Sequence, residues 1–303
     1  MVSVFLLSWD HEKYIAKAIR SVLAQSYRDI EIIYVDNNSI DKSFEIASEL
    51  LSESGLNYTA HKRETNYGIA ANHNYAFQQG RGEYFCPLSA DDWLHKDNIL
   101  LKLRALRNDP TAGMVYSGGY KYYDELDLYE PFNVITFPPD IAREELLKKN
   151  FISATGCLIK RKVIEDVGLW NETYQIEDGD MWVRIVSKYK IIGIPDYLFF
   201  YRQHSSSFTS DPERTLRAKM EWLNAHKHLN KYPLVTRRNN IENYLSVRVM
   251  QETSLKLFLQ VVKNFRFNRM LFNLLLKAIL PVKMKQFLRQ RALVRRFGKI
   301  RPE

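Results

Sequence analysis

The fold is decided by residues 2–41, which read VSVFLLSWDHEKYIAKAIRSVLAQSYRDIEIIYVDNNSID. Val2–Leu7 is a short apolar run of the kind that forms a buried parallel strand, and Ile30–Val35 is a second one. Between them, His11–Gln25 carries apolar residues at helical spacing. A strand, a helix and a strand joined by short connections predict a right-handed crossover. We therefore expect an α/β fold with a parallel sheet.

The same alternation continues to about residue 110 and then loosens. Further helices are expected at Asp41–Ser52, capped by Asp41, and at Ile69–Gln79; further strands are expected at Tyr58–His61 and Glu83–Leu88. Beyond residue 110 we expect a strand at 114–123, a loop at 126–139 and helices at 141–150 and 181–189. After Asp211 the pattern is almost wholly helical, with breaks at Pro233 and Pro281. These patterns predict an α/β domain over residues 1–210 and a helical region over 211–303.

The composition is that of a globular protein with a sizeable core. The chain has 303 residues, of which 46% are hydrophobic and 26% charged. Two cysteines, Cys86 and Cys157, are too few for a disulfide framework, which favours a reducing compartment. The N-terminus lacks a basic region before its apolar run, and no apolar stretch is long enough to span a bilayer, the nearest being Met270–Val282. We therefore expect a cytoplasmic protein.

Positive charge is concentrated at the C-terminal end. From Val261 onward there is one acid, Glu303, and twelve basic residues: Lys263, Arg266, Arg269, Lys277, Lys283, Lys285, Arg289, Arg291, Arg295, Arg296, Lys299 and Arg301. Apolar residues recur three or four apart among them, so helices here would have an apolar face and a cationic one. Beyond Pro281 this pattern favours a helix lying on an anionic membrane surface. For residues before about 265, packing on the protein body is the preferred interpretation.

Polar clusters follow the predicted strands. Asp36 ends the second strand, and Asp91-Asp92 ends the fourth, where adjacent carboxylates suit Mg²⁺ or Mn²⁺. Glu177–Asp180 precedes a helix and could supply a general base. Farther on, His204 could ligate a metal ion and Arg202 could neutralise phosphate charge. Taken singly, each cluster is better explained as a turn, a helix cap or a surface side chain.

The order of the N-terminal motifs resembles glycosyltransferase family 2, the inverting enzymes with the GT-A fold that use nucleotide-activated sugars. Val2–Asp10 is similar to the opening strand of that family, with Leu7 and Trp9 in places usually held by proline and tyrosine. Glu31–Asp41 resembles the second strand and its Asp-Asp-Gly-Ser-x-Asp turn. Asn66–Asn74 resembles the Asn-x-Gly and Ala-Arg-Asn run, with His73 in the arginine place.

Later motifs extend the resemblance to about residue 205. Ser89–Asp92 is similar to the Asp-x-Asp-Asp metal motif, with serine in the first place. Glu177–Arg184 resembles the Glu-Asp motif that carries the base, and Tyr201–His204 resembles the closing loop of the metal site.

The resemblance implies a nucleotide site. Ser8, Trp9 and Asp36 would hold the base, Trp9 by stacking and Asp36 by hydrogen bonding. The remaining nucleotide-binding residues would be Asn66, Gly68, His73 and Asp91, the last at the ribose or the metal.

The resemblance also implies a metal ion and a base. Asp92 and His204 would ligate Mn²⁺ or Mg²⁺ at the diphosphate. Asp178 would take the proton of the acceptor hydroxyl, with Glu177 and Asp180 shaping its surroundings. The implied activity is metal-dependent, inverting hexosyl transfer.

The partners implied are a UDP- or dTDP-sugar donor and a glycan or lipid-linked glycan acceptor, with a role in bacterial surface polysaccharide synthesis. The enzyme would sit peripherally on the inner face of the cell membrane, held by its basic tail. Two other functions remain open at this point. A sugar-nucleotide pyrophosphorylase would also have a nucleotide-binding α/β sheet, and the tail alone would suit a nucleic-acid-binding protein. We expect no nucleic acid as a partner, because the acidic strand ends would repel a polyanion.

Overall fold

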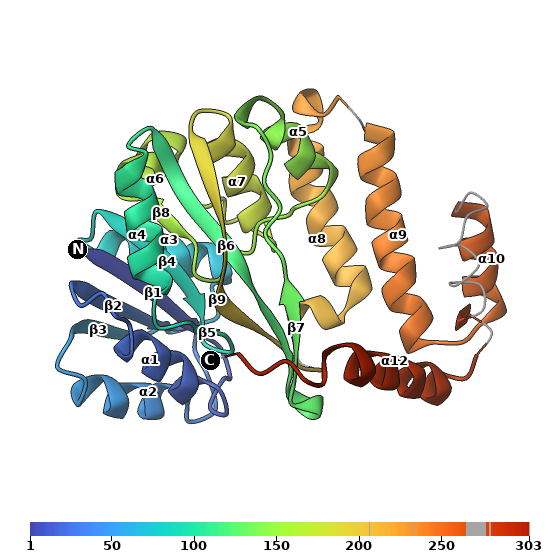
Figure 1. The fold of residues 1–303 in the computed structure, drawn as a ribbon, viewed down its shortest axis with the longest axis horizontal. Coiled ribbons are helices and arrows are strands. Elements are labelled where there is room, and N and C mark those ends of the chain that lie inside the picture. The colour runs from blue at the N-terminus through green and yellow to red at the C-terminus, as the bar shows by residue number, and fades with distance from the viewer. Residues whose placement is uncertain (206, 232, 265–276, 279, 303) are drawn as a thin grey trace. The chain divides into compact units, whose positions relative to one another are not determined.

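The computed structural model describes residues 1–205, 207–231, 233–264, 277–278 and 280–302, and divides into two compact units (Figure 1). The first unit comprises residues 1–122, 131–146 and 151–202. The second comprises 123–130, 147–150 and the described residues from 203 onward. The predicted cations Arg266 and Arg269, and most of the apolar stretch Met270–Val282, lie outside the described residues.

The strands form one mixed sheet. They are β1 (Val2–Ser8), β2 (Ile30–Asp36), β3 (Asn57–Lys62), β4 (Tyr84–Ser89), β5 (Trp93–Leu94), β6 (Ala112–Tyr123), β7 (Leu128–Phe132), β8 (Leu158–Lys160) and β9 (Lys190–Gln203). Their order is β3-β2-β1-β4-β8-β6-β9-β5, and β7 pairs with β6. The pairs β1–β2, β1–β4 and β2–β3 are parallel, whereas β8 runs antiparallel to both β4 and β6. The predicted parallel sheet is therefore the N-terminal half of a mixed one.

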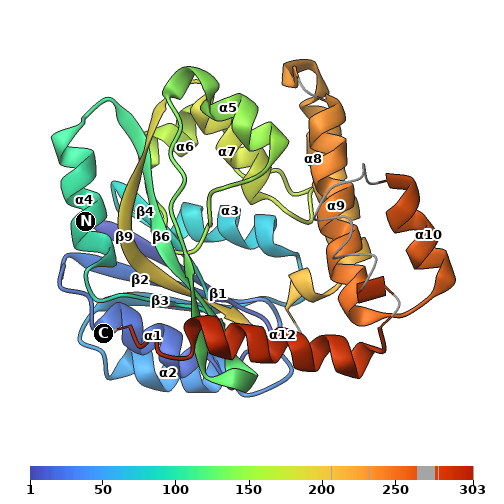
Figure 2. The ribbon, with the colours of Figure 1, turned by 45° about the vertical axis from the view of Figure 1, so that its right-hand side comes forward.

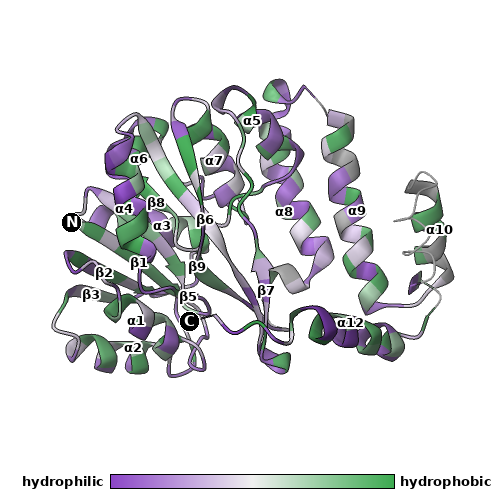
Figure 3. Cartoon of the chain, viewed as in Figure 1, coloured by the Kyte–Doolittle hydropathy of each residue, from purple (hydrophilic) through white to green (hydrophobic). Residues whose placement is uncertain are grey.

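The helices of the first unit cover both faces of this sheet. They are α1 (Ile15–Leu23), α2 (Ser43–Ser52), α3 (Ile69–Gln79), α4 (Asn98–Asn108), α6 (Arg161–Val167) and α7 (Asp178–Val186), with α5 (Pro139–Lys148) at the unit boundary. Figure 2 shows α1 and α2 on one side of β1–β3 and α3 on the other. Buried residues of α1, α2 and α4 form one apolar cluster with Val2, Val4 and Leu6 of β1. Figure 3 shows both hydrophobic and hydrophilic residues on α1 and α2, as surface helices require.

Two local predictions differ from the structure. The segment predicted as a loop at 126–139 contains β7, because a turn at Asp127, with φ of 43°, returns the chain to pair with β6. Helix α2 begins at Ser43, and its N-cap is Lys42 rather than Asp41. The Asp41 carboxylate instead accepts hydrogen bonds from Ser43 N–H and Glu12 N–H, both at 2.9 Å.

The second unit is built on helices α8 (Pro212–Ala225), α9 (Pro233–Gln251), α10 (Leu255–Asn264) and α12 (Val282–Phe297). Asp211 caps α8 by accepting hydrogen bonds from the N–H groups of Glu213 and Arg214. A small apolar cluster joins α9 and α10 through Leu245, Val249, Leu257, Val261 and Ala278. In the described part of the chain, no helix combines the length and the apolar character that crossing a bilayer requires.

A lysine is buried in the core of the first unit. Lys102, in the middle of α4, has no exposed surface, and its Nζ donates to Gly156 O at 2.5 Å. Burial lowers its pKa from 10.5 to about 8, because the interior disfavours the charged form. Between pH 8 and pH 10.5, Lys102 is protonated in the unfolded chain and largely deprotonated in the folded one. The free energy of unfolding contributed by Lys102 therefore rises with pH across this window.

The first prediction is a pH-dependent difference between the wild type and Lys102→Met. From pH 8 to pH 10.5 the wild type should gain about 3 kcal/mol of unfolding free energy relative to the variant, measured by urea unfolding. Exposed Arg104 on the same helix supplies the control, since Arg104→Met should show no such trend. A constant difference across the window would mean that the pKa of Lys102 is not lowered.

Candidate functional site

The carboxyl ends of three parallel strands meet at one edge of the sheet. Ser8 at the end of β1 pairs with Asp36 at the end of β2, and Leu7 pairs with Ser89 at the end of β4. The loops that begin with Trp9, with residue 37 and with residue 90 therefore leave the sheet side by side. This is the edge at which open α/β sheets bind ligands.

Asp36 is fully buried, and its carboxylate accepts four hydrogen bonds. Oδ2 accepts from the hydroxyls of Ser8 at 2.8 Å, Tyr34 at 3.2 Å and Ser39 at 2.6 Å. Oδ1 accepts from Ser39 N–H at 2.8 Å. Burial raises the pKa of Tyr34, so its hydroxyl keeps its proton. Asp36 and Ser8, expected to bind the base, here fix the two strand ends to each other, and Asp36 exposes no oxygen to a ligand.

The loops after β1 and β2 are fastened together by backbone donors. Asp10 N–H donates to Ser39 Oγ at 2.9 Å, and Ile40 N–H donates back to Asp10 Oδ1 at 2.9 Å. His11 N–H donates to Ser43 Oγ at 2.7 Å. Because each loop satisfies the other's polar groups, the pair forms a rigid frame at the sheet edge.

Trp9 lies exposed on this frame. Its side chain is 50% exposed, and the next residue, Asp10, has a φ of 56°. Asn38, in the facing loop, has a φ of 65°. Left-handed conformations are costly for residues other than glycine and concentrate at functional sites. The predicted stacking residue is thus half-exposed and lies beside two turns with left-handed backbone.

Asn37 is a residue that the sequence analysis did not single out. Its Nδ2 donates to Asn66 Oδ1 at 2.8 Å, and its Oδ1 accepts from Tyr67 N–H at 2.9 Å. Asn66 Oδ1 also accepts from Gly68 N–H at 3.0 Å, where Gly68 has a φ of 84° and precedes α3. Asn66 and Gly68, both predicted nucleotide-binding residues, are therefore joined to the β2 strand end. The sequence signals for Asn37 were its place directly after Asp36 and the second place of the Asp-Asp-Gly-Ser-x-Asp turn.

Asp91 and Asp92 occupy different environments. Asp92 is buried, and its Oδ2 accepts from Thr155 Oγ1 at 2.5 Å while its Oδ1 accepts from Arg202 N–H at 2.9 Å. Burial, followed by the charge of Asp91, raises the pKa of Asp92 well above its usual range. Asp91 is half-buried. The structure thus engages both oxygens of Asp92, the predicted metal ligand, inside the protein. Thr155 had no sequence signal.

Arg202 holds the Asp91-Asp92 turn from the other side. Its Nε donates to Asp91 O at 2.9 Å, in addition to the backbone bond to Asp92. The guanidinium lies 4.6 Å from the Tyr14 ring centroid and 4.9 Å from that of Trp93. Arg202 is buried, and aromatic faces stabilise its charge. Its cation therefore lies close to the strand end where the carboxylates are.

His73 is buried away from the strand ends, against the start of α7. Its Nε2 lies 3.6 Å from Glu177 Oε1, and its ring stacks on Trp170 with centroids 4.9 Å apart. The neighbouring Asn74 side chain accepts a hydrogen bond from Trp170 N–H and donates one to the Trp170 carbonyl, each at 2.9 Å. The structure therefore brings His73 together with Glu177, and α3 fixes the position of the N-terminus of α7.

Asp178 and Asp180 of α7 differ in burial, as Asp91 and Asp92 do. Buried Asp180 accepts from both Nε and Nη2 of Arg184 at 2.8 Å, and Arg184 also donates to the carbonyls of Val167 and Gly168. Asp178 is half-buried in the first turn of the helix, where the helix dipole favours an ionised carboxylate. Asp178 is thus the more accessible of the two, and Asp180 fastens the helix to the preceding loop.

Among the described residues, few side chains lie where they could ligate a divalent metal ion. In the part of the chain that the structure describes, no three His, Cys, Asp or Glu side chains gather as a metal-binding group. His204 belongs to the second unit, where its N–H faces Ser207 Oγ at 3.4 Å. Mg²⁺ and Mn²⁺ at phosphates commonly use one or two carboxylates, with substrate oxygens completing the shell. Half-buried Asp91 fits that mode.

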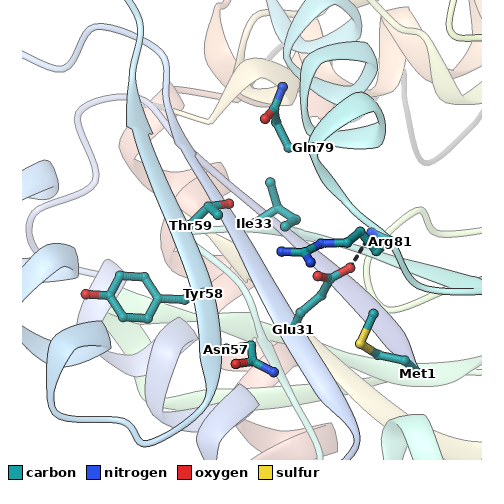
Figure 4. A pocket seen from close by; sticks show the side chains of 8 residues that line it. All are labelled: Met1, Glu31, Ile33, Asn57, Tyr58, Thr59, Gln79 and Arg81. Carbon is teal, nitrogen blue, oxygen red and sulfur yellow. Dashed lines mark hydrogen bonds between the residues drawn. The ribbon is translucent and has the colours of Figure 1, made fainter.

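A pocket lies at the opposite edge of the sheet, where β1, β2 and β3 begin (Figure 4). Its lining consists of Met1, Glu31, Ile33, Asn57, Tyr58, Thr59, Gln79 and Arg81. Buried Glu31 accepts hydrogen bonds there from Ser3 Oγ, Arg81 N–H and Gly82 N–H. The Glu31 carboxylate thus links β2 to β1 and to the residues that precede β4. The pocket lining includes none of the predicted site residues.

Comparison with solved structures identifies the fold. The chain matches a mannosyltransferase, PcManGT from Pyrobaculum calidifontis, with a TM-score of 0.59 and 15% identity, covering 99% of this chain and 88% of that one. It matches S. aureus TarS residues 1–349 with a TM-score of 0.56 and 16% identity, covering 96% and 92%. Both likenesses show the GT-A fold expected from the sequence.

Sequence comparison gives the family. The chain is 28% identical over 220 residues to the glycosyltransferase GlyG of Streptococcus pneumoniae, covering 68% of this chain and 72% of that protein. An uncharacterized glycosyltransferase of Rickettsia felis is 30% identical over 192 residues, covering 61% of this chain, and this chain spans only 31% of that protein. The profile of glycosyl transferase family 2 matches residues 3–168, more than half of the chain. The chain belongs to glycosyltransferase family 2, and it is a glycosyltransferase of the GT-A fold.

Proposed function

We propose that this glycosyltransferase moves a hexosyl group from a nucleotide-sugar donor to an acceptor hydroxyl, with inversion and with the help of a divalent metal ion. One observation carries the proposal: the exposed side chain of Trp9 and the half-buried carboxylate of Asp91 follow the carboxyl ends of two paired parallel strands, β1 and β4. A side chain that can stack on a base and a carboxylate that can bind a metal ion at the diphosphate are therefore presented at one edge of the sheet.

The donor end is proposed to lie at the β1, β2 and β4 strand ends. Trp9 supplies an exposed indole for stacking on the base, and Asn66 and Gly68 line the adjoining loop. Asp36, Ser8 and Asp92 position these loops rather than touch the donor, because their polar atoms are engaged inside the protein. Two similar structures support a nucleotide-sugar donor, since TarS is complexed with UDP-GlcNAc and PcManGT with GDP-Man and Mn²⁺. For this chain we propose a UDP- or dTDP-sugar.

Asp178 is the proposed base. It takes the proton of the acceptor hydroxyl while that oxygen attacks the anomeric carbon from the face opposite the diphosphate. The carbon–oxygen bond to the diphosphate breaks, and its electron pair leaves with the diphosphate. A single displacement of this kind inverts the anomeric configuration. Glu177 and Asp180 keep Asp178 in place through His73 and Arg184.

Asp91 is the proposed protein ligand of Mn²⁺ or Mg²⁺, in preference to Asp92, and the ligand role of His204 stays a prediction from the sequence. When bound, the ion offsets the negative charge that develops on the departing diphosphate. Arg202, held beside the same turn, adds a fixed positive charge. Its aromatic contacts hold the guanidinium in place before the donor arrives.

The second prediction concerns the base. Asp178→Asn should lower the transfer rate by about 10²–10⁴-fold, because the amide cannot take the proton, while donor affinity stays nearly constant. Transfer is measured by nucleotide diphosphate release with a panel of nucleotide sugars, and donor binding by calorimetry. Asp166→Asn, at an exposed carboxylate on α6 that pairs with Lys188, is the control and should keep full activity. Near-normal turnover of Asp178→Asn would leave Asp178 as a helix-terminal carboxylate only.

The third prediction separates the two strand-end aspartates. Asp91→Asn should abolish the Mn²⁺-dependent part of UDP binding and lower the melting temperature less than Asp92→Asn does. Asp92→Asn should lower the melting temperature as well, since the Asn side chain cannot accept both buried hydrogen bonds. Calorimetric titration of UDP with Mn²⁺ or with EDTA makes the comparison. Equal UDP affinity in Mn²⁺ and EDTA would refute the metal dependence.

The acceptor is proposed to be a glycan or lipid-linked glycan of bacterial surface polysaccharide synthesis, reached by peripheral attachment to the cytoplasmic leaflet. Helix α12 supports the attachment. Met284, Phe287 and Leu288, which share one helical face, are each at least 50% exposed, and basic residues surround them. Lys285 faces inward, donating to Val249 O at 2.7 Å and to Glu252 O at 2.6 Å. This anchor fixes which side of α12 faces outward.

The fourth prediction concerns this helix. Phe287→Gln with Leu288→Gln, and separately Arg291→Gln with Arg295→Gln, should each reduce flotation with anionic vesicles, because both insertion and charge contribute. Binding should fall at high salt and be absent with neutral vesicles. Arg104→Gln with Arg107→Gln, on exposed positions of α4, is the control. Unchanged flotation of both α12 variants, or preferential binding to RNA, would reject the membrane as the partner.

A further inference from the structure

Residues 153–157, here called the connecting loop, make contacts in three directions. Thr155 Oγ1 donates to Asp92 at 2.5 Å, and Gly156 N–H donates to Pro87 O of β4 at 2.9 Å. The Gly156 carbonyl accepts a hydrogen bond from Lys102 Nζ at 2.5 Å. A shift of this loop would therefore displace the Asp91-Asp92 turn.

The backbone of the connecting loop is held against α4. Gly156 has a φ of 69°, and a Cβ there would lie 2.7 Å from Asn98 Nδ2 and 2.8 Å from Leu94 Cδ2. Its carbonyl accepts the hydrogen bond from Lys102 Nζ. The loop thus fits closely between its neighbours, and the Lys102 side chain holds the Gly156 carbonyl.

Burying the Lys102 side chain to satisfy the Gly156 carbonyl costs folding free energy. The titratable groups that act on it are the buried thiols of Cys86 and Cys157, and among the described residues no carboxylate forms an ion pair with it. A buried cation without a counter-charge costs stability, and an apolar side chain of similar size is often tolerated better in such a place. Local costs of this kind are expected where a protein positions a functional site.

We propose that Lys102 is a positioning residue of the transferase, which holds the connecting loop and, through Thr155, keeps the Asp91-Asp92 turn in place. The inference rests on the proposed function of these carboxylates. Lys102 touches neither substrate in this proposal and acts through Gly156 and Thr155. Because transfer needs the acceptor oxygen and the anomeric carbon in contact, a small displacement of the turn that binds the donor slows the reaction strongly.

The experiment compares Lys102→Met, Thr155→Val and the double variant, with Arg104→Met as the control. Each single variant should lower kcat by about 10–100-fold and leave the affinity for UDP within about twofold, because geometry rather than binding is lost. Both changes act through the same loop, so the double variant should be scarcely slower than the worse single one. A full multiplication of the two effects, or a kcat of Lys102→Met close to that of the wild type, would overturn the proposal.

Hydrogen exchange without substrate gives a second, independent readout. The amides of residues 155–157 should exchange faster in Lys102→Met than in wild type, whereas those of β1 and β2 should not. Unchanged exchange in the loop would overturn the proposal even if the enzyme transfers sugar. If wild type transfers no sugar from any donor, the proposed function fails, and the exchange still tests the link from Lys102 to the loop. Should Lys102→Met not fold, Lys102→Leu, which also lacks a donor for the Gly156 carbonyl, is measured in its place with the same expectations.

Discussion

The carboxylate of Asp92 joins the two halves of the sheet, and the candidate site depends on it. It follows β4, the last parallel strand, and accepts hydrogen bonds from Thr155, just before β8, and from the backbone of Arg202 in β9. Arg202 in turn holds the carbonyl of Asp91. Because both oxygens of Asp92 are engaged and buried, the turn has little freedom, and the half-buried side chain of Asp91 is presented from a fixed position.

The acidic residues of the site divide by burial. Asp36, Asp92 and Asp180 are buried and accept hydrogen bonds from nearby donors, so they hold strand ends and a helix in place. Asp91 and Asp178 are half-buried and lie at a strand end and a helix start. A carboxylate surrounded by protein donors is rigid but inaccessible, whereas one at the edge can reach a ligand. The proposed chemistry therefore uses the second group, and the first group supports it.

Local patterns in the chain were enough to predict the N-terminal architecture. Apolar runs and helical spacing predicted β1, α1 and β2 to within a few residues, and α3 at its observed bounds, because local periodicity reports which face is buried. The ordered motifs also indicated the family, which the match over residues 3–168 confirms. Adjacent acids at strand ends marked the candidate site, since the ends of parallel strands must meet at one edge.

The division of roles among the acids came from long-range packing. Asp92 and Thr155 are 63 residues apart, and Asp92 and Arg202 are 110 apart, so no local pattern shows that Asp92 is buried with both of its oxygens accepting hydrogen bonds. The same holds for Lys102, whose partner Gly156 is 54 residues away. Sequence spacing reports residue types and local conformation, whereas burial and hydrogen-bond partners arise when distant segments meet. For this reason the motifs located the candidate site, and the three-dimensional fold distinguished the buried acids from the accessible ones.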